Sequence, residues 1–126
     1  MRAFLLSLPL VWLPLLASAE TVNLLMAEED GCMWCARWES DVGIEYPKTA
    51  EGASAPLIKH DIHADLPEGV TLTRPLQFTP TFVLLVDGAE VGRIEGYPGE
   101  DFFWGLLSKM ISDAGIEPVQ KPEASS

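Results

Sequence analysis

The chain has 126 residues, with 19 acidic and 8 basic side chains and a formal net charge of −11 at neutral pH. This length suffices for one small domain with a core of its own. The acidic surface repels phosphate backbones, so nucleic acid is a poor partner, and proteins with basic side chains around their contact surface are favoured.

The N-terminal residues have the pattern of an export signal. One arginine precedes an apolar stretch over residues 3–16, and Ala17-Ser18-Ala19 follows it. A charged start, an apolar centre and a small-x-small ending are typical of a secretory signal peptide, so we expect residues 1–19 to be removed. A retained membrane anchor is the alternative, but the run is short for a bilayer and two prolines interrupt it. The exported compartment is usually oxidising, which permits a disulfide.

The first part of the mature chain is predicted to contain a strand, a helix and a second strand. Residues 21–27 (TVNLLMA) form a short apolar run typical of a buried strand. Residues 32–44 carry large apolar side chains at helical spacing, which predicts a helix that ends before Pro47. Residues 48–55 are small and polar, so we expect a loop or a frayed turn there. Residues 56–62 (PLIKHDI) are typical of the second strand.

The next part is predicted to be a broken segment followed by a hairpin. Residues 63–78 contain two prolines and a glycine, which argues against a long helix but permits a short helical turn around 74–78. Residues 81–86 (TFVLLV) are almost all apolar, as expected of a central strand. Asp87-Gly88 is a strong turn signal, and the alternating pattern of residues 90–95 completes the hairpin.

The last predicted element is a helix over residues 100–114, whose apolar side chains recur on one face and whose end Gly115 caps. Residues 118–126 are rich in proline, serine and charge, so we expect a disordered tail. The first two strands flank a helix and should be parallel, while the last two should be antiparallel. The sequence therefore predicts an α/β domain over residues 20–117, with a central mixed sheet of about four strands flanked by helices.

Cys32 and Cys35 are the candidate catalytic residues, and they are the only cysteines of the chain. Residues three apart lie on one helical face, so their sulfurs can bond without movement of the backbone. Unpaired backbone N–H groups and the helix dipole at the first turn stabilise a thiolate at Cys32, whereas Cys35 should be more buried. We predict that Cys32 attacks a disulfide and that Cys35 resolves the mixed disulfide.

The Cys-x-x-Cys pattern is also compatible with three other kinds of site. A haem attachment site needs histidine directly after the second cysteine, but that position is Ala36. A zinc site could combine both cysteines with His60 and His63, although the spacing is longer than usual and the two histidines would point to opposite faces of a strand. A structural disulfide would close a very small loop and would stabilise the fold little. We therefore expect a redox pair, without metal or cofactor.

Together with later segments, the cysteine motif resembles the thioredoxin superfamily. The similar segments, in chain order, are Gly31-Cys32-Met33-Trp34-Cys35, Thr79-Pro80, the predicted strand at 81–86, Asp87-Gly88 and Val91-Gly92-Arg93-Ile94-Glu95-Gly96-Tyr97. The resemblance implies a thioredoxin-like fold, with a cis peptide bond before Pro80 in a loop beside the cysteines. It also implies that the backbone of Thr79 pairs with the chain of the substrate. Without the cysteines, a trans proline that opens a strand would be the favoured interpretation, because cis bonds before proline are uncommon.

Trp34 stands between the two cysteines on a turn that we expect to be exposed. It is a candidate for a docking surface together with Thr79 and Pro80, and simple packing is the alternative.

The chain departs from the thioredoxin pattern in three ways. Met33-Trp34 replaces Gly-Pro between the cysteines, Gly31 replaces the usual tryptophan, and Met26 replaces the usual buried acid. Proton removal from Cys35 must then use water or a nearby acid such as Glu28 or Glu29. The acidic residues 28–30 more simply form a solvated loop, and their charge should raise the pKa of Cys32. This favours a reductant over a strong oxidant, which needs a very stable thiolate.

Residues 25–35 and Tyr46-Pro47-Lys48-Thr49-Ala50 resemble the small exported thioredoxin-like proteins that are encoded with bacterial sulfur-oxidation systems, often called SoxS. The resemblance implies a monomeric periplasmic reductase that keeps the cysteine of a sulfur-carrier protein free and takes electrons from a membrane thiol transporter. The alternatives are a general disulfide reductase or isomerase of exported proteins, for instance in cytochrome maturation, and a zinc-binding or structural module.

Overall fold

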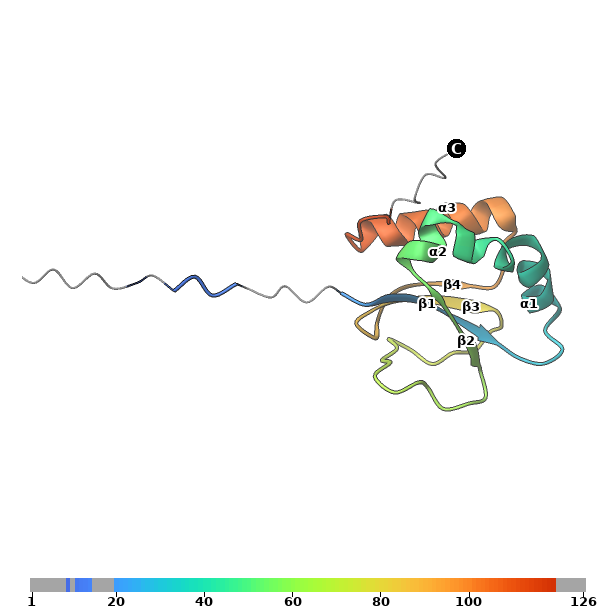
Figure 1. The fold of residues 1–126 in the computed structure, drawn as a ribbon. Coiled ribbons are helices and arrows are strands. Elements are labelled where there is room, and N and C mark those ends of the chain that lie inside the picture. The colour runs from blue at the N-terminus through green and yellow to red at the C-terminus, as the bar shows by residue number, and fades with distance from the viewer. Residues whose placement is uncertain (1–8, 10, 15–19, 120–126) are drawn as a thin grey trace, which may run out of the picture.

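A four-stranded sheet carries the helices on one face and a long loop on the other (Figure 1). The computed structural model describes residues 9, 11–14 and 20–119. Its elements are β1 (Val22–Glu28), α1 (Met33–Trp38), the π-helical turn η1 (Glu39–Gly43), the 3₁₀ turn η2 (Tyr46–Lys48), α2 (Ala50–Ser54), β2 (Leu57–Asp61), β3 (Thr81–Val86), β4 (Ala89–Glu95) and α3 (Glu100–Asp113).

Two predicted segments fall largely outside the described residues. Most of the predicted signal peptide, namely residues 1–8, 10 and 15–19, lies outside them, as does the predicted tail from residue 120 onward. Among the residues that are described, none of the helices combines the length and the apolar character needed to cross a bilayer.

The strand order of the sheet is β2-β1-β3-β4. β1 runs parallel to β2 and antiparallel to β3, and β3 and β4 form an antiparallel hairpin. The parallel pair follows from the helical connection between β1 and β2. The hairpin follows from Asp87-Gly88, where both residues have positive φ angles, of 51° and 81°. The predicted mixed sheet of four strands is thus confirmed.

Alternation along the strands divides the apolar core between the two faces of the sheet. The helical side holds Leu24, Met26, Phe82 and Leu84 of β1 and β3 together with the buried side chains of the helices. Trp38 of α1 lies at the centre of this side, with its ring centroid 5.1 Å from that of Phe82 and 5.7 Å from that of Phe103. Because Trp38 is buried against both β3 and α3, it holds the C-terminal end of α1 against the sheet.

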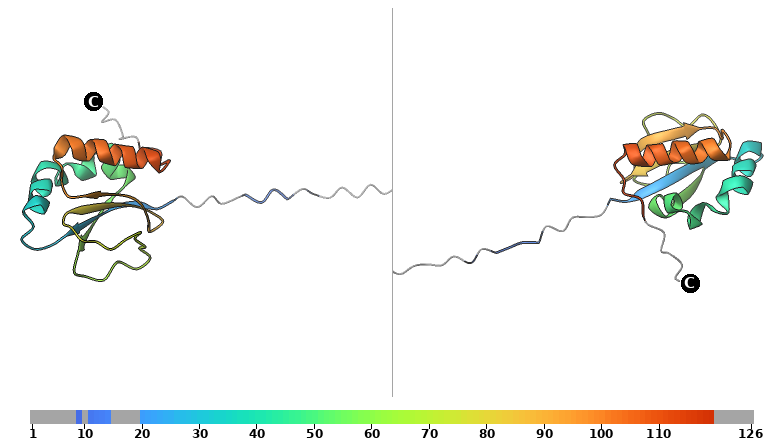
Figure 2. Two further views of the ribbon diagram at one scale, coloured as in Figure 1. Left: turned by 180° about the vertical axis from the view of Figure 1, so that it is seen from behind. Right: turned by 90° about the horizontal axis from the view of Figure 1, so that it is seen from above.

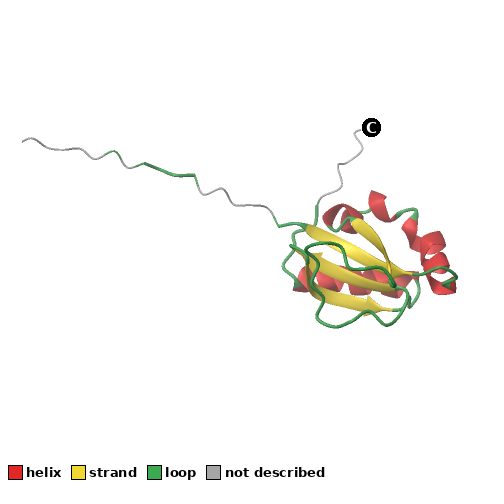
Figure 3. Cartoon of the chain, turned by 90° about the horizontal axis from the view of Figure 1, so that it is seen from below, coloured by secondary structure: helices red, strands yellow, loops and turns green. Residues whose placement is uncertain are grey.

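The opposite face of the sheet is covered by the loop between β2 and β3 (Figures 1 and 3). Val70, Leu72 and Leu76 of this loop pack against the apolar side chains of β1 and β3 that point away from the helices. The helices therefore flank one face of the sheet, and the loop takes the place of a second helical layer.

A buried ion pair holds this loop to β4. The side chains of Arg93 and Glu90 are only 5% and 4% exposed. Arg93 also donates hydrogen bonds to the backbone carbonyls of Arg74 and Pro75, at 2.9 and 3.3 Å. Burial alone would raise the pKa of Glu90, but hydrogen bonds from Arg93 and Thr73 outweigh this effect and hold the pKa below its usual value.

Two stretches between the strands differ from the local patterns in the sequence. The short helical turn considered for residues 74–78 does not form, because carbonyls of this stretch accept hydrogen bonds from Arg93 instead. The loop predicted for residues 48–55 is wrong, since most of this stretch is α2. Thr49 caps that helix by accepting a hydrogen bond from the Gly52 N–H at 3.0 Å.

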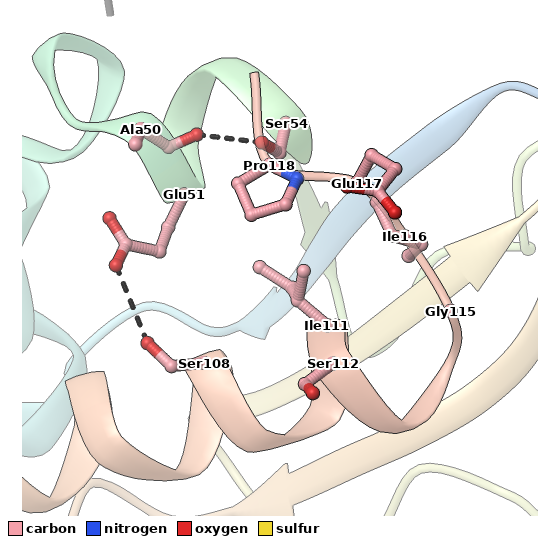
Figure 4. A pocket seen from close by; sticks show the side chains of 10 residues that line it. All are labelled: Ala50, Glu51, Ser54, Ser108, Ile111, Ser112, Gly115, Ile116, Glu117 and Pro118. Atoms are coloured by element: carbon pink, nitrogen blue, oxygen red, sulfur yellow. Dashed lines mark hydrogen bonds between the residues drawn. The ribbon is translucent and has the colours of Figure 1, made fainter. Parts of the chain in front are cut away.

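A hollow of about 300 Å³ lies between α2, α3 and the segment that follows α3 (Figure 4). The N–H of Val119, within the first part of the predicted tail, donates to Ser54 Oγ at 2.8 Å. The hollow lies at the C-terminal end of α3, whereas α1 lies near the N-terminal end of α3 (Figure 2). It is therefore remote from the cysteines at the start of α1.

Candidate active site

Cys32 and Cys35 form a disulfide at the start of α1, with their Cα atoms 5.2 Å apart. Cys32 caps the helix, and its sulfur accepts a hydrogen bond from the Cys35 N–H at 3.1 Å. Cys35 is 7% exposed and packs into the core, whereas Cys32 is half-buried. The predicted placement of the pair at the helix start is confirmed. Cys35 is the more buried of the two because it shares with Trp38 the face of α1 that packs into the core.

The Thr79-Pro80 loop lies beside α1, and its peptide bond is cis, as the resemblance implied. Pro80 is buried, and its carbonyl accepts a hydrogen bond from the Gly96 N–H at 2.7 Å. Within the described residues, the backbone N–H and C=O of Thr79 have no hydrogen-bond partner. These two groups remain available to an extended chain that passes next to the disulfide.

A groove of about 310 Å³ joins this loop to the cysteine motif. It is lined by Trp34, Thr79, Pro80, Glu95, Gly96, Tyr97 and Pro98. The structure therefore brings together all three residues that were expected to form the docking surface. Trp34 is 56% exposed, so much of its ring faces solvent instead of the core.

Tyr97 and Asp41 support the wall of the groove, and no local pattern pointed to either residue. The Tyr97 hydroxyl donates to Asp41 Oδ2 at 2.9 Å, and Arg37 Nε lies 3.3 Å from the same oxygen. Burial and the hydrogen bond to Asp41 raise the pKa of Tyr97 to about 12. Tyr97 thus stays protonated and ties the chain after β4 to η1.

Glu29 does not lie in a purely solvated loop. Its Oε1 accepts a hydrogen bond from the Thr79 hydroxyl at 2.7 Å, and its Oε2 lies 3.0 Å from His63 Nε2. The bond from Thr79, and then that with His63, lowers the pKa of Glu29 below its usual value. Both carboxylate oxygens are therefore engaged with neighbouring loops.

A second hollow, of about 470 Å³, lies on another side of the disulfide. It is lined by residues 28–33, Cys35, Ala36, Glu39 and Lys59. Lys59 Nζ lies 2.8 Å from Glu39 Oε2, and this hydrogen bond raises the pKa of Lys59. Five titratable side chains therefore line this hollow together with Cys35, namely Glu28, Glu29, Asp30, Glu39 and Lys59. The spacing from Cys35 to Glu39 is helical, but Lys59 could be found only from the pairing of β1 with β2.

The four side chains of the alternative zinc site do not converge. The two cysteines are joined to each other, and His63 lies against Glu29. His60 is buried on β2 and lines a separate hollow beneath the loop between β2 and β3. The alternation of β2 separates His60 from the cysteine motif.

Comparison with known proteins gives one informative match. No protein-family model and no curated protein matches the chain. Among solved structures, the chain is similar to the periplasmic thioredoxin SoxS from Paracoccus pantotrophus in its reduced form, with 49% identity and a TM-score of 0.73. The match covers 74% of this chain and 98% of that chain. This chain belongs to the SoxS family of thioredoxins.

Membership of the SoxS family confirms the thioredoxin-like fold. Together with the Cys32–Cys35 pair, it makes the protein a thiol–disulfide oxidoreductase whose substrates are protein thiols and disulfides. Glu29, Glu39, Lys59, Asp41 and Tyr97 are the residues near the pair whose contacts emerged only from the structure.

Proposed function

We propose that this SoxS-family protein is a periplasmic dithiol reductant that keeps the cysteine of a sulfur-carrier protein reduced. The observation that carries the proposal is the 49% identity to a periplasmic SoxS over 98% of that chain. We further propose that residues 1–19 direct export and are removed, and that a membrane thiol transporter returns electrons to the oxidised pair.

The proposed reaction transfers two electrons through two exchanges. The Cys32 thiolate attacks a sulfur of the partner's disulfide, forms a mixed disulfide, and displaces the partner's other sulfur as a thiolate. Cys35 then loses its proton, and its thiolate attacks the Cys32 sulfur. This step releases the partner's second thiolate and leaves the Cys32–Cys35 disulfide. The pair is oxidised by two electrons, and the partner's disulfide is reduced to two thiols.

Cys35 lines the same hollow as Glu39 and Lys59, so its proton can pass to a group or a water molecule in that hollow. Of the acids considered from the sequence, Glu28 lines this hollow, while the carboxylate of Glu29 is bonded to Thr79 and His63. We therefore propose that water in this hollow, next to Glu28 and the Glu39–Lys59 pair, takes the proton.

We propose that the partner's chain lies in the groove between Trp34 and Tyr97. Thr79 would pair with it through its free backbone groups, next to Pro80, and Trp34 would cover an apolar side chain beside the reacting sulfur. Hydrogen bonds to the backbone fix the direction of a bound chain but read little of its sequence. Selection of the partner would then fall to Trp34 and to the acidic surroundings.

The reduction potential of the Cys32–Cys35 pair tests the direction of the reaction. We expect a value near that of a thioredoxin, about −270 mV, because the acids at 28–30 disfavour the Cys32 thiolate. Equilibration with glutathione or dithiothreitol, followed by alkylation, measures it. A value near that of a strong oxidase, about −120 mV, would overturn the proposed direction.

Trapping with Cys35→Ser tests the partner. Without the resolving thiol, mixed disulfides at Cys32 persist and can be isolated from the periplasm and identified. A sulfur-carrier protein among them supports the proposal, whereas a spread of unrelated exported proteins or cytochrome-maturation factors would favour a general reductase. The Cys32→Ser/Cys35→Ser variant, which has no thiol, controls for non-covalent capture.

A further inference from the structure

Glu29 joins the turn before the cysteines to the proline loop. Its backbone carbonyl accepts a hydrogen bond from the Cys32 N–H at 3.3 Å, which closes the turn that leads into α1. Its carboxylate oxygen Oε1 accepts a hydrogen bond from the Thr79 hydroxyl, with 2.7 Å between the two oxygens. One residue thus contacts, through its two ends, both the attacking cysteine and the residue before the cis proline.

The two bonds of the carboxylate differ in strength. The Glu29 side chain is 38% exposed, and His63, which lies 3.0 Å from it, is 76% exposed. Water competes with the histidine contact, so that contact contributes little. The bond from Thr79 is shorter, at 2.7 Å, and partly buried, which makes it the stronger of the two. The fixed relation is therefore the one between Glu29 and Thr79.

Thr79 has few other constraints of its own. The bonds that hold the rest of the loop are on its neighbours, from the Gly96 N–H to the Pro80 carbonyl and from the Thr81 hydroxyl to the Phe78 carbonyl. Among the described residues, the hydroxyl bond to Glu29 is the one polar contact that ties Thr79 to the cysteine turn. Disulfide exchange needs three sulfurs in line, so a small shift of the bound chain relative to Cys32 slows it strongly.

We propose that Glu29 is a positioning residue, which fixes Thr79 relative to Cys32 so that a bound chain presents its disulfide in line with the Cys32 sulfur. The proposal rests on the proposed function, because it requires the backbone of Thr79 to pair with the substrate. It gives Glu29 a role that acts through hydrogen-bond geometry and not through proton transfer from Cys35.

The test compares a protein disulfide with a small one. Insulin can pair with Thr79, whereas hydroxyethyl disulfide is too small to do so, and the readout is the ratio of their kcat/KM values. Because both rates depend on the same folded enzyme, the ratio does not change if a variant is partly unfolded. We expect Glu29→Ala and Thr79→Val each to lower this ratio about tenfold, the loss typical of one charge-assisted hydrogen bond.

Matched variants separate geometry from charge. Glu68→Gln removes an exposed charge that lines neither hollow beside the disulfide and has no contact with Thr79, so it should leave the ratio as in the wild type. Glu29→Gln loses the charge but keeps an acceptor, and Thr79→Ser keeps the donor, so both should retain most of the ratio. Glu29→Ala/Thr79→Val should be no worse than either single change, because both remove the same bond.

An equal loss for both disulfides, a ratio changed by Glu68→Gln, or additive effects in the double variant would each overturn the role of Glu29. Failure of the proposed function is distinguishable, since the wild-type dithiol would then reduce insulin no faster than free dithiothreitol does. The wild-type measurement is therefore made first.

Discussion

Three consecutive acidic residues, 28–30, precede Gly31 and Cys32, and their side chains make different contacts in the folded protein. Glu28 and Asp30 line the hollow next to the disulfide, while the carboxylate of Glu29 is turned to Thr79 and His63. Negative charge near a thiol disfavours its ionised form, so Glu28 and Asp30 oppose the stabilisation of the thiolate by the start of α1. The reactivity of Cys32 is a balance between these two effects.

Removal of two of these charges is expected to increase the ionisation of Cys32. In Glu28→Gln/Asp30→Asn the pKa of Cys32 should fall, because two negative charges beside the thiolate are removed, while the bond from Thr79 to Glu29 is kept. Thiolate absorbance of the reduced protein, or the rate of alkylation as a function of pH, measures this shift. Glu68→Gln/Glu117→Gln, which removes two exposed charges that do not line the hollow beside the disulfide, is the charge-matched control. An unchanged Cys32 titration in the double variant would refute the electrostatic argument.

The segment between α1 and β2 shows how packing decides the conformation of a polar stretch. Tyr46 is buried and donates its hydroxyl to the Ala55 carbonyl at 2.6 Å, which closes α2 against η2. The stretch contains Gly52, which in sequence is typical of a loop. In the structure a Cβ at this position would overlap the backbone carbonyl of Tyr46, so glycine is needed for the close approach of the two turns.

Two glycine-to-alanine substitutions in helices are therefore expected to have opposite effects. Gly52→Ala should lower the free energy of unfolding by about 1–3 kcal/mol, because backbone must move to accommodate the methyl group. Gly105→Ala in α3 meets open space and should raise it by about 0.5–1 kcal/mol through helix propensity. Urea unfolding of both variants measures the difference. A neutral or stabilising Gly52→Ala would contradict the close contact.

At the scale of the whole molecule, carboxylates of β4 connect the sheet to the loop that covers its second face. Glu90 accepts hydrogen bonds from Thr73 of the loop between β2 and β3, and its buried pair with Arg93 orients that side chain toward the loop carbonyls of Arg74 and Pro75. Glu95 contacts Arg74 of the same loop, and the hydrogen bond from Arg74 lowers the pKa of Glu95. Because the second face of the sheet has no helical layer, these pairs support the only cover that the described residues provide there.

The free energy of unfolding should therefore decrease as the pH falls into the acidic range. The pKa values of Glu90 and Glu95 are lowered in the folded state, so the unfolded state binds more protons. Their contribution is complete above their unfolded pKa, near 4.5, and is lost as the pH falls through the folded values. We expect the urea midpoint to fall steeply below about pH 4.5.

Glu90→Gln isolates the buried pair in this pH profile. At neutral pH it leaves the buried Arg93 with only the longer contact to Glu95, at 3.5 Å, which should cost about 3 kcal/mol, the lower end for a broken buried pair. Its midpoint should also change less with pH than that of the wild type, because one of the titrating groups is gone. Glu68→Gln, an exposed position on the same loop, is the charge-matched control. A Glu90→Gln profile parallel to that of the wild type would show that the pair does not contribute to the acid sensitivity.

Local patterns were sufficient for the strands, the hairpin, α3 and the placement of the cysteines, because each depends on periodicity or on a turn within a few residues. Cys-x-x-Cys at a helix start and Thr79-Pro80 before an apolar strand indicated the family in the same way. The tertiary structure alone decided the partners of Glu29, Lys59 and Arg93, which lie far away in the chain. Their contacts depend on strand register and on a loop held by burial, and no local pattern encodes either of these.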